Sequence, residues 1–316
     1  MAVRTTDDPV VVNAASPLRA SFNFLREAPL IPMFILLTLA VSALFAPVLA
    51  PYGKLQSVPV TDEQCKAKYG RAFRSCYLDD DPPFFMQGSI LRTALGTDYL
   101  GRDNLSRLMH GARISLLVSL TGTLAAGAIG TLLGILAGYM GNVWDQIIMR
   151  ITDAWLTLPT LVFAILLASI RGPGLWNVVF ILAVVFWSRY ARLVRGEVLT
   201  LRERDFVRLA EVNGVSKINI ILRHLLPNVM NTVMVFFTLI VGVAIIIEAN
   251  LSFLGVGVPP PEPAWGLMIS QEREALMEGK WWLAAWPGLC IMLLVLSANM
   301  LGDWLRVRLD PQLRNR

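Results

Sequence analysis

The chain carries little charge for its length. Only 16% of its 316 residues are Asp, Glu, Lys or Arg, whereas soluble domains carry about 25%. Hydrophobic residues make up 55% of the chain, and they form unbroken blocks rather than recurring at the period of a strand or a surface helix. Because such blocks are typical of membrane-spanning helices, the composition excludes an ordinary soluble domain.

Cysteine and histidine are scarce, with three and two residues respectively. Cys290 lies inside an apolar block, where we expect it to pack as a small hydrophobe. Cys65 and Cys76 share a polar loop, and either a disulfide or two free thiols fits their spacing. We predict no metal site. His110 follows Ser106 by four residues, but no orienting acid or oxyanion donor accompanies the pair, so we predict no catalytic site.

A nucleotide-binding loop is missing from the sequence. The pattern Gly-x-x-x-x-Gly-Lys-Ser/Thr cradles phosphates, but the Gly-Lys pairs at 53–54 and 279–280 lack both the first glycine and the hydroxyl residue. We therefore expect no ATP, Mg²⁺ or other cofactor on this chain. The net charge of +5 does not indicate nucleic acid, because the arginines cluster beside apolar blocks and no nucleic-acid-binding motif is present.

Six apolar segments are long enough, or nearly so, to cross a bilayer core, which takes about 20 helical residues. We predict an all-α integral membrane protein with six transmembrane helices. Pro173 and Gly174 separate the third and fourth segments and predict a tight helical hairpin. A short amphipathic helix is predicted over 89–112, before the second span. The six segments are 30–50, 114–139, 154–170, 175–190, 229–250 and 281–301.

Basic residues indicate that both ends of the chain are cytoplasmic. Cytoplasmic loops of membrane proteins carry an excess of Lys and Arg, and the stretch 189–223 between the fourth and fifth spans holds eight of them. The first apolar block follows a polar leader and is long enough to span, so we expect a retained signal anchor. The predicted organisation is a cytoplasmic segment at 1–29, the first helix at 30–50, an external loop at 51–113, a five-helix core at 114–303 with a cytoplasmic loop at 191–227, and a cytoplasmic tail at 304–316.

Small residues recur at every fourth position of the second span, at Ala126, Gly130, Gly134 and Gly138. This spacing places them in one stripe along a helix, where another helix backbone can approach closely. The sequence leaves open whether that helix belongs to this chain or to a partner subunit.

The stretch from Asp205 to Asn228 predicts two short helices on the cytoplasmic side. Asp205 is placed as the cap of the first helix and Ser216 as the cap of the second, with a bend at Gly214 between them. Leu209, Val212, Val215 and Ile218 would form an apolar face. Such a face can dock in a groove of another protein or lie in the lipid headgroups, and periodicity does not separate these alternatives.

Few polar residues lie near membrane depth. Glu248 and Asn250 end the fifth span, and Asn231 lies near its start. Ionisable and polar residues in spans are candidates for a solute pathway, although residues near a span edge also serve as caps or interfacial groups. We therefore predict these three residues as pathway candidates and keep the structural alternative.

The stretch 205–228 resembles the cytoplasmic EAA loop of ABC import permeases. Ala210, Gly214, Leu226 and Pro227 fall at the matching positions, whereas Arg208, Leu209 and His224 depart from the pattern. The segment Leu-Gly-Thr-Asp-Tyr-Leu-Gly-Arg-Asp at 95–103 and the stretches 106–107, 111–113, 248–257, 260–266, 301–303 and 309–311 are similar to dipeptide, oligopeptide and nickel permeases. The resemblance covers residues 25–314 and points to the second permease of the pair, the one with the long first external loop.

This resemblance implies a type I ABC importer permease fold and a set of partners. These are a second homologous permease, two ATP-binding subunits that hydrolyse ATP, an external solute-binding protein and the lipids of a bacterial inner membrane. The solute would be a peptide or a similar small molecule. The alternative is an ion-coupled secondary transporter without ATPase partners, but no acid lies at mid-span and no repeated halves are visible. The ATPase-coupling residues that the resemblance implies are Ala210, Glu211, Val212, Gly214, Val215, Leu226 and Pro227.

Overall fold

The computed structural model describes residues 29–70, 78–90 and 93–309. Its described residues form helices and connecting loops, and the β pairing among them is limited to two isolated bridges, Ser57 with Arg102 and Thr97 with Asp103. The predicted all-α class is confirmed. The helices are α2 (Leu30–Leu44), α3 (Ala46–Leu49), α4 (Asp62–Tyr69), α5 (Asn104–Met140), α6 (Asn142–Thr157), α7 (Thr160–Arg171), α8 (Leu175–Arg202), α9 (Asp205–Val212), α10 (Lys217–Ile220), η1 (Ile221–Leu225, a π-helix), α11 (Leu226–Phe253), α12 (Trp265–Gln271), α13 (Arg273–Met277) and α14 (Trp282–Leu309).

The spans differ from six continuous helices. In the described part of the chain, four helical stretches are each long and apolar enough to cross a membrane, namely α5, α8, α14 and the run 217–253 that ends with α11. The predicted third span is wrong as one straight helix, because α6 and α7 meet at an angle of 94°. Leu158 and Pro159 separate them, and Pro159 disfavours helical backbone at the residue before it. The first apolar helix, α2, has 15 residues and is shorter than a usual span.

The helix α5 is longer than the apolar block from which it was predicted. It runs for 37 residues from Asn104, ten residues before the predicted start, and Asp103 caps it by accepting a hydrogen bond from the Ser106 N–H at 2.8 Å. The predicted amphipathic helix over 89–112 is therefore wrong for 93–103, which are loop, while 104–112 belong to α5 itself. Hydropathy missed this because a helix can continue beyond the membrane core.

The stripe of small residues packs within the chain. A Cβ added at Gly130 would lie 2.3 Å from the Trp187 carbonyl oxygen of α8, and one at Gly134 would lie 2.7 Å from the Ala191 oxygen. Both distances are shorter than any ordinary contact, so only glycine allows α5 and α8 to approach this closely. Of the two alternatives for the stripe, the structure supports packing inside the subunit.

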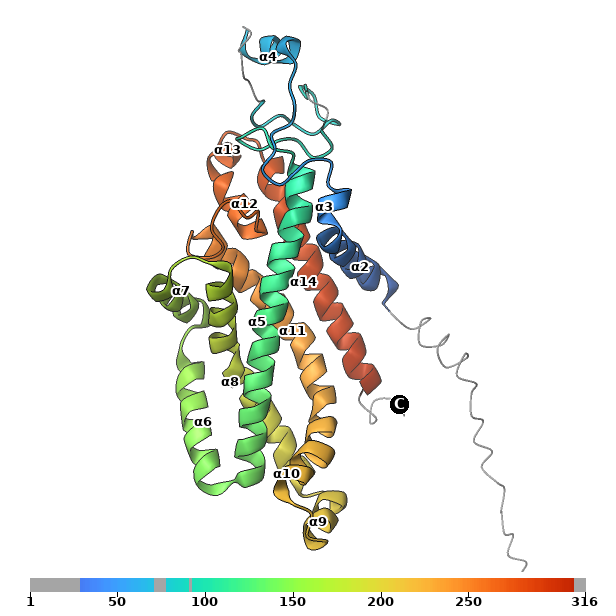
Figure 1. Ribbon diagram of the computed structural model, residues 1–316, viewed down its shortest axis with the longest axis vertical. Helices are drawn as coiled ribbons and strands as arrows, with labels where there is room; N and C mark the ends of the chain where they lie inside the picture. The colour runs from blue at the N-terminus through green and yellow to red at the C-terminus, as the bar shows by residue number, and fades with distance from the viewer. Residues whose placement is uncertain (1–28, 71–77, 91–92, 310–316) are drawn as a thin grey trace, which may run out of the picture.

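The molecule is elongated, with α5, α8, α11 and α14 running along its length (Figure 1). We call its two extremities the α4 end, which carries α4 and α13, and the α9 end, which carries α9 and α10. The main apolar core joins α5, α7, α8 and α11, and a second core joins α2, α5, α11, α12 and α14. The long helices therefore connect two ends that have different chemistry.

Candidate functional site

The helix α9 begins after a turn at the end of α8. Arg204 is its capping residue and Asp205 its first helical residue, so the predicted cap at Asp205 is wrong by one position. The acidic side chain still lies in the first turn, where its negative charge interacts favourably with the positive end of the helix dipole. The helix ends before Gly214, whose φ of +74° is the left-handed conformation that glycine adopts most easily. The predicted bend at Gly214 is thus confirmed.

The second predicted short helix is continuous with the fifth span. Ser216 caps α10 by accepting a hydrogen bond from the Asn219 N–H at 3.4 Å, as predicted. The chain then passes through the π-helix η1 into α11, which has Pro227 in its first turn. Proline has no N–H to donate to the preceding turn, and a π-helix is a rare single-turn irregularity within an otherwise α-helical run. A displacement at α10 can therefore act directly on α11.

The apolar residues of α9 and α10 divide into two sets. Val207 and Ala210 are buried in the main core, and Val215 packs against it. The other set faces outward, with exposed fractions of 60% for Leu209, 84% for Val212 and 68% for Ile218. We call Leu209, Val212 and Ile218 the exposed apolar patch. The predicted apolar face therefore consists of three outward-facing residues, with Val215 turned toward the core.

A side-chain hydrogen bond joins α9 to the C-terminal end of α5. The Tyr139 hydroxyl donates to Glu211 Oε1 at 3.1 Å. Tyr139 is buried at 6% exposure, whereas Glu211 is exposed. A nearby ion pair joins Arg195 of α8 to Asp145 of α6, with both guanidinium contacts at 2.6–2.7 Å. The α9 end is thus held by polar contacts to α5 and between α6 and α8, while the exposed apolar patch faces outward among charged side chains.

The α4 end holds a buried cluster of charges at the start of α5. Asp98 is completely buried and accepts from Arg102 Nε at 2.7 Å, from the Leu100 N–H at 2.9 Å, and also from Arg107 Nη1. Arg107 donates a further bond to Gln271 Oε1 at 2.7 Å. Because Gln271 is 164 residues away in the sequence, this arginine ties the loop before α5 to the segment after α11.

Glu272 lies beside this cluster and is only 2% exposed. Its Oε1 is 4.0 Å from Arg107 Nη1, which is too far for a hydrogen bond. Burial, followed by the negative charges of Asp98 and Asp80, raises the pKa of Glu272 to about 7, and Arg107 opposes the shift only in part. Its carboxyl group therefore changes charge near neutral pH.

Sequence reasoning did not identify the Asp98 cluster as a site. The segment 95–103 and Arg107 were noted only for their resemblance to known permeases. The stretch 98–107 holds several charged residues in an otherwise apolar chain. Because buried charges are usually paired, this density of charge was a sign that the residues contact one another. Gln271 and Glu272 carried no comparable signal, because their contact with Arg107 depends on the tertiary fold.

The predicted pathway residues occupy different environments. Glu248 is completely buried, and its Oε1 accepts from the Ser252 hydroxyl at 2.8 Å. Ser252 in turn accepts from the Val258 N–H at 3.2 Å, so this pair supports the loop that leads to α12. Asn231 is exposed near the start of α11. Glu248 thus lies within the helix packing, and a role for these residues in a pathway stays a prediction.

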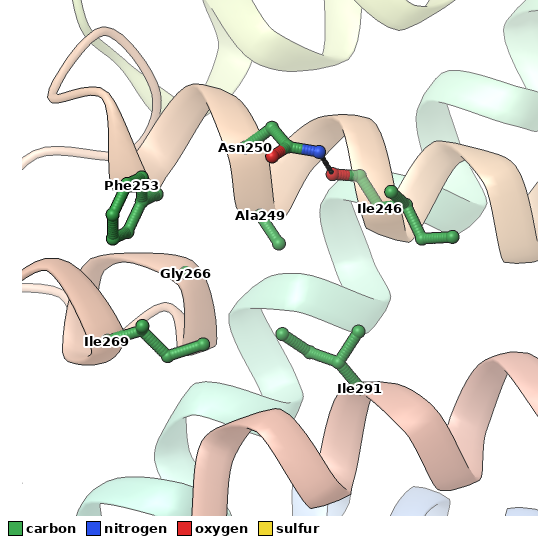
Figure 2. Close-up of a pocket in the computed structure, with 7 residues that line it drawn as sticks. All are labelled: Ile246, Ala249, Asn250, Phe253, Gly266, Ile269 and Ile291. Carbon is green, nitrogen blue, oxygen red and sulfur yellow. Dashed lines mark hydrogen bonds between the residues drawn. The ribbon is translucent and has the colours of Figure 1, made fainter. Parts of the chain in front are cut away.

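Asn250 lines a cavity of about 350 Å³ between α11, α12 and α14 (Figure 2). Ile246, Phe253 and Ile291 contribute apolar walls, and the Asn250 amide donates to the Ile246 carbonyl at 2.8 Å. Because the Asn250 amide donates to a carbonyl of its own helix, the cavity walls are mostly apolar, with this one amide group among them.

The cysteine prediction falls partly outside the described residues. Cys65 is buried in α4 at 2% exposure, whereas Cys76 lies outside the described residues, so the predicted disulfide stays a prediction. Within the described ranges, no group of three or more His, Cys, Asp or Glu side chains is placed to hold a metal ion.

Comparison with known proteins identifies the chain. Residues 130–315 match the family model of binding-protein-dependent transport system inner membrane components. The chain is 41% identical to a di/tripeptide transport system permease of Pseudomonas aeruginosa, over 90% of this chain and 88% of the relative. It is 36% identical to a dipeptide transport system permease of Alkalihalophilus pseudofirmus, over 96% and 92%.

A third relative is a glutathione transport system permease of Pectobacterium atrosepticum, which is 42% identical over 70% of this chain and 73% of the relative. The relatives therefore match the chain over most of its length. Together with the family model, this supports a permease over a secondary transporter. The chain belongs to the family of binding-protein-dependent transport system inner membrane components and is a membrane-spanning permease of an ABC transport system.

Proposed function

We propose that this chain is one of two permease subunits of an ATP-driven importer for peptides or a similar small solute. Each of the three relatives described above is named for the transport of dipeptides, tripeptides or glutathione. In this proposal a second, homologous permease completes the pathway, two ATP-binding subunits supply the energy, and an external binding protein delivers the solute.

The observation that carries the proposal is the exposed apolar patch on α9 and α10. Burying one such side chain contributes about 1.5–3 kcal/mol, so Leu209, Val212 and Ile218 together favour binding to another protein. Single exposed apolar residues are ordinary on a protein surface, but three on one short helical element, each at least 60% exposed, favour an interaction site. We assign the patch to a groove of the ATPase subunit, with lipid headgroups as the alternative that the experiment below tests.

The proposed coupling element consists of the patch and the residues that shape it. Gly214 sets the angle between α9 and α10, and Pro227 begins the helix that receives their movement. ATP and Mg²⁺ bind to the partner subunits, because this chain has no phosphate-binding sequence. The coupling residues of this proposal are Ala210, Glu211, Val212, Gly214, Val215, Leu226 and Pro227.

The proposal places the chain in the bacterial inner membrane with the α9 end and both termini in the cytoplasm. The basic stretch 189–223 supports this orientation. The start of α2 and the end of α14 point away from the α4 end (Figure 1). A C-terminal tag should resist protease in intact spheroplasts and become accessible after lysis, and cleavage in intact spheroplasts would contradict the orientation.

The test of the proposed function is affinity purification of the chain from detergent-solubilised membranes, followed by identification of the proteins that co-purify. Recovery of a second permease and ATPase subunits, with ATP-dependent uptake of a di- or tripeptide after reconstitution, is the expected result. Recovery of this chain alone from a preparation that still performs uptake would overturn the proposal.

A further inference from the structure

The hydrogen bond between Tyr139 and Glu211 joins two elements that are otherwise held by non-directional contacts. The residues are 72 positions apart, and the bond is 3.1 Å long. Val207 and Ala210 attach the rest of α9 to the membrane helices through apolar packing, which allows sliding because it has no preferred direction. A hydrogen bond is directional, so this one, although long at 3.1 Å for an O–H···O bond, favours one position of α9 where apolar packing does not.

The other side-chain bond of α9 cannot serve the same purpose. Arg208 contacts Glu203, but both side chains are more than half exposed and Glu203 lies in the turn directly before α9. An exposed local pair contributes little and does not fix α9 against another helix. Among the described side chains, the hydrogen bond that fixes α9 against a membrane helix is therefore the one between Tyr139 and Glu211.

Tyr139 lies one residue before the end of a long, continuous element. The 37 residues of α5 extend about 55 Å at 1.5 Å per residue. At the opposite end, Arg107 of the same helix bonds Asp98 and Gln271. Close packing of Gly130 and Gly134 against α8 supports the C-terminal third of α5. A pull applied at Tyr139 therefore reaches the α4 end without passing through a loop.

We propose that Tyr139 and Glu211 are a positioning pair that transmits the movement of α9 to α5. This inference rests on the proposed function, in which the ATPase subunit moves α9. When the bond is intact, a displacement of α9 carries the end of α5 with it. When the bond is absent, α9 keeps its chain connections to α8 and α10 and its apolar contacts, but less of its movement reaches α5, and ATP is hydrolysed with less transport.

The test uses the complete transporter reconstituted in proteoliposomes, with both permeases, the ATPase subunits and the binding protein. The Tyr139→Phe variant loses only the hydroxyl group. Its matched control is Tyr190→Phe, because the buried Tyr190 hydroxyl on α8 has no hydrogen-bond partner among the described residues. We expect Tyr139→Phe to assemble and to keep basal ATP hydrolysis, while uptake per ATP hydrolysed falls about fivefold or more. Tyr190→Phe should match the wild type in this ratio.

A double-mutant cycle tests whether Tyr139 and Glu211 act together or independently. Glu211→Ala should lower the ratio as much as Tyr139→Phe does, and the double variant should be no worse than either single variant. Glu211→Gln keeps an acceptor oxygen and should recover part of the ratio. A wild-type ratio in Tyr139→Phe, or losses that multiply in the double variant, would overturn the positioning pair.

Assembly is measured separately so that two failures can be distinguished. If Tyr139→Phe does not assemble, the exposed Glu211→Ala decides, and a wild-type ratio in that variant overturns the inference. If the unmodified chain recruits no ATPase, the proposed function itself fails. Assembly and coupled uptake in the wild type, with unchanged coupling in the variants, would overturn only the role of the pair.

Discussion

The two ends of the molecule differ in the kind of side chain that they bury and expose. At the α4 end, charged groups are buried, and Asp98 forms ion pairs with both Arg102 and Arg107 within the chain. At the α9 end, the apolar groups of Leu209 and Val212 are exposed and find no cover within the chain. Buried charges that are paired complete a structure, whereas uncovered apolar groups call for a partner. Apolar side chains such as Met277 are exposed at the α4 end as well, so the buried charge cluster is what distinguishes that end as a structural anchor. The α9 end has the role of a binding surface in the proposed function.

The largest loss of stability is expected when the charge of Asp98 is removed from the buried cluster. Asp98→Asn leaves the buried Arg102 and Arg107 without their counter-charge, which costs about 3–5 kcal/mol when one partner of a buried pair is removed. We expect a much lower thermal unfolding midpoint of the purified protein. Lys54→Ala is the control, because the Lys54–Glu262 pair is about one-third exposed and contributes at most about 1 kcal/mol. Equal losses in the unfolding midpoint of the two variants would contradict the role of Asp98 as a structural anchor.

A second effect is expected from placing charge on the binding surface. Val212→Glu puts a carboxylate where the account requires burial, so binding of the ATPase subunit should weaken by about tenfold or more, measured with permeases in nanodiscs. The control is Met277→Glu at the α4 end, where the side chain is 87% exposed. Both variants should retain the wild-type unfolding midpoint. Equal ATPase affinity in Val212→Glu and the wild type would remove the distinction between the ends.

A third effect tests the connection between the ends. Gly130→Ala places a methyl group 2.3 Å from the Trp187 carbonyl oxygen, so α5 and α8 must separate at a cost of about 1–3 kcal/mol. Gly196→Ala in α8 is the control, because its Cβ would meet open space. Thermal unfolding distinguishes the two variants. A midpoint in Gly130→Ala at or above that of the control would show that the close approach is not required.

The last effect is a pH dependence at the α4 end. Because burial raises the pKa of Glu272 to about 7, the folded state holds this proton at pH values where the unfolded chain has released it. Its contribution to stability is present below the ordinary carboxyl pKa and is lost as pH rises to 7, at no more than about 1.4 kcal/mol per pH unit. Unfolding midpoints at pH 5 and pH 8 should differ less in Glu272→Gln than in the wild type. The same pH 5 to pH 8 difference in both proteins would contradict the raised pKa of Glu272.

Much of the fold follows from apolar blocks alone, and the exceptions have physical causes. Blocks long enough to span predicted α5, α8, α11 and α14, because a helix in lipid must satisfy its own backbone. Their true ends were not predicted, because α5 and α8 continue beyond their apolar blocks. The 94° bend between α6 and α7 was missed, although Pro159 marked it. Hydropathy reports how much of a segment is apolar, and it does not report whether the helix is broken.

The sequence predicted those features of the candidate site that depend on neighbouring residues in the chain. Gly214 and Ser216 mark a bend and a cap, and both lie within a few residues of the contacts they make. The bond from Tyr139 to Glu211 and the contact of Arg107 with Gln271 depend on how distant helices pack. The sequence contains these residues without indicating which of them meet, so the contacts that join the two ends required the structure.

Site-specific photocross-linking in the assembled transporter shows directly whether the exposed apolar patch contacts an ATPase subunit. A cross-linking amino acid replaces Val212 at the α9 end in one sample and Met277 at the α4 end in another. The account predicts cross-links from position 212 to an ATPase subunit and none to that subunit from position 277. Cross-links from position 212 to lipid alone, in a transporter that contains the ATPase, would contradict the assignment of the exposed apolar patch as the docking surface.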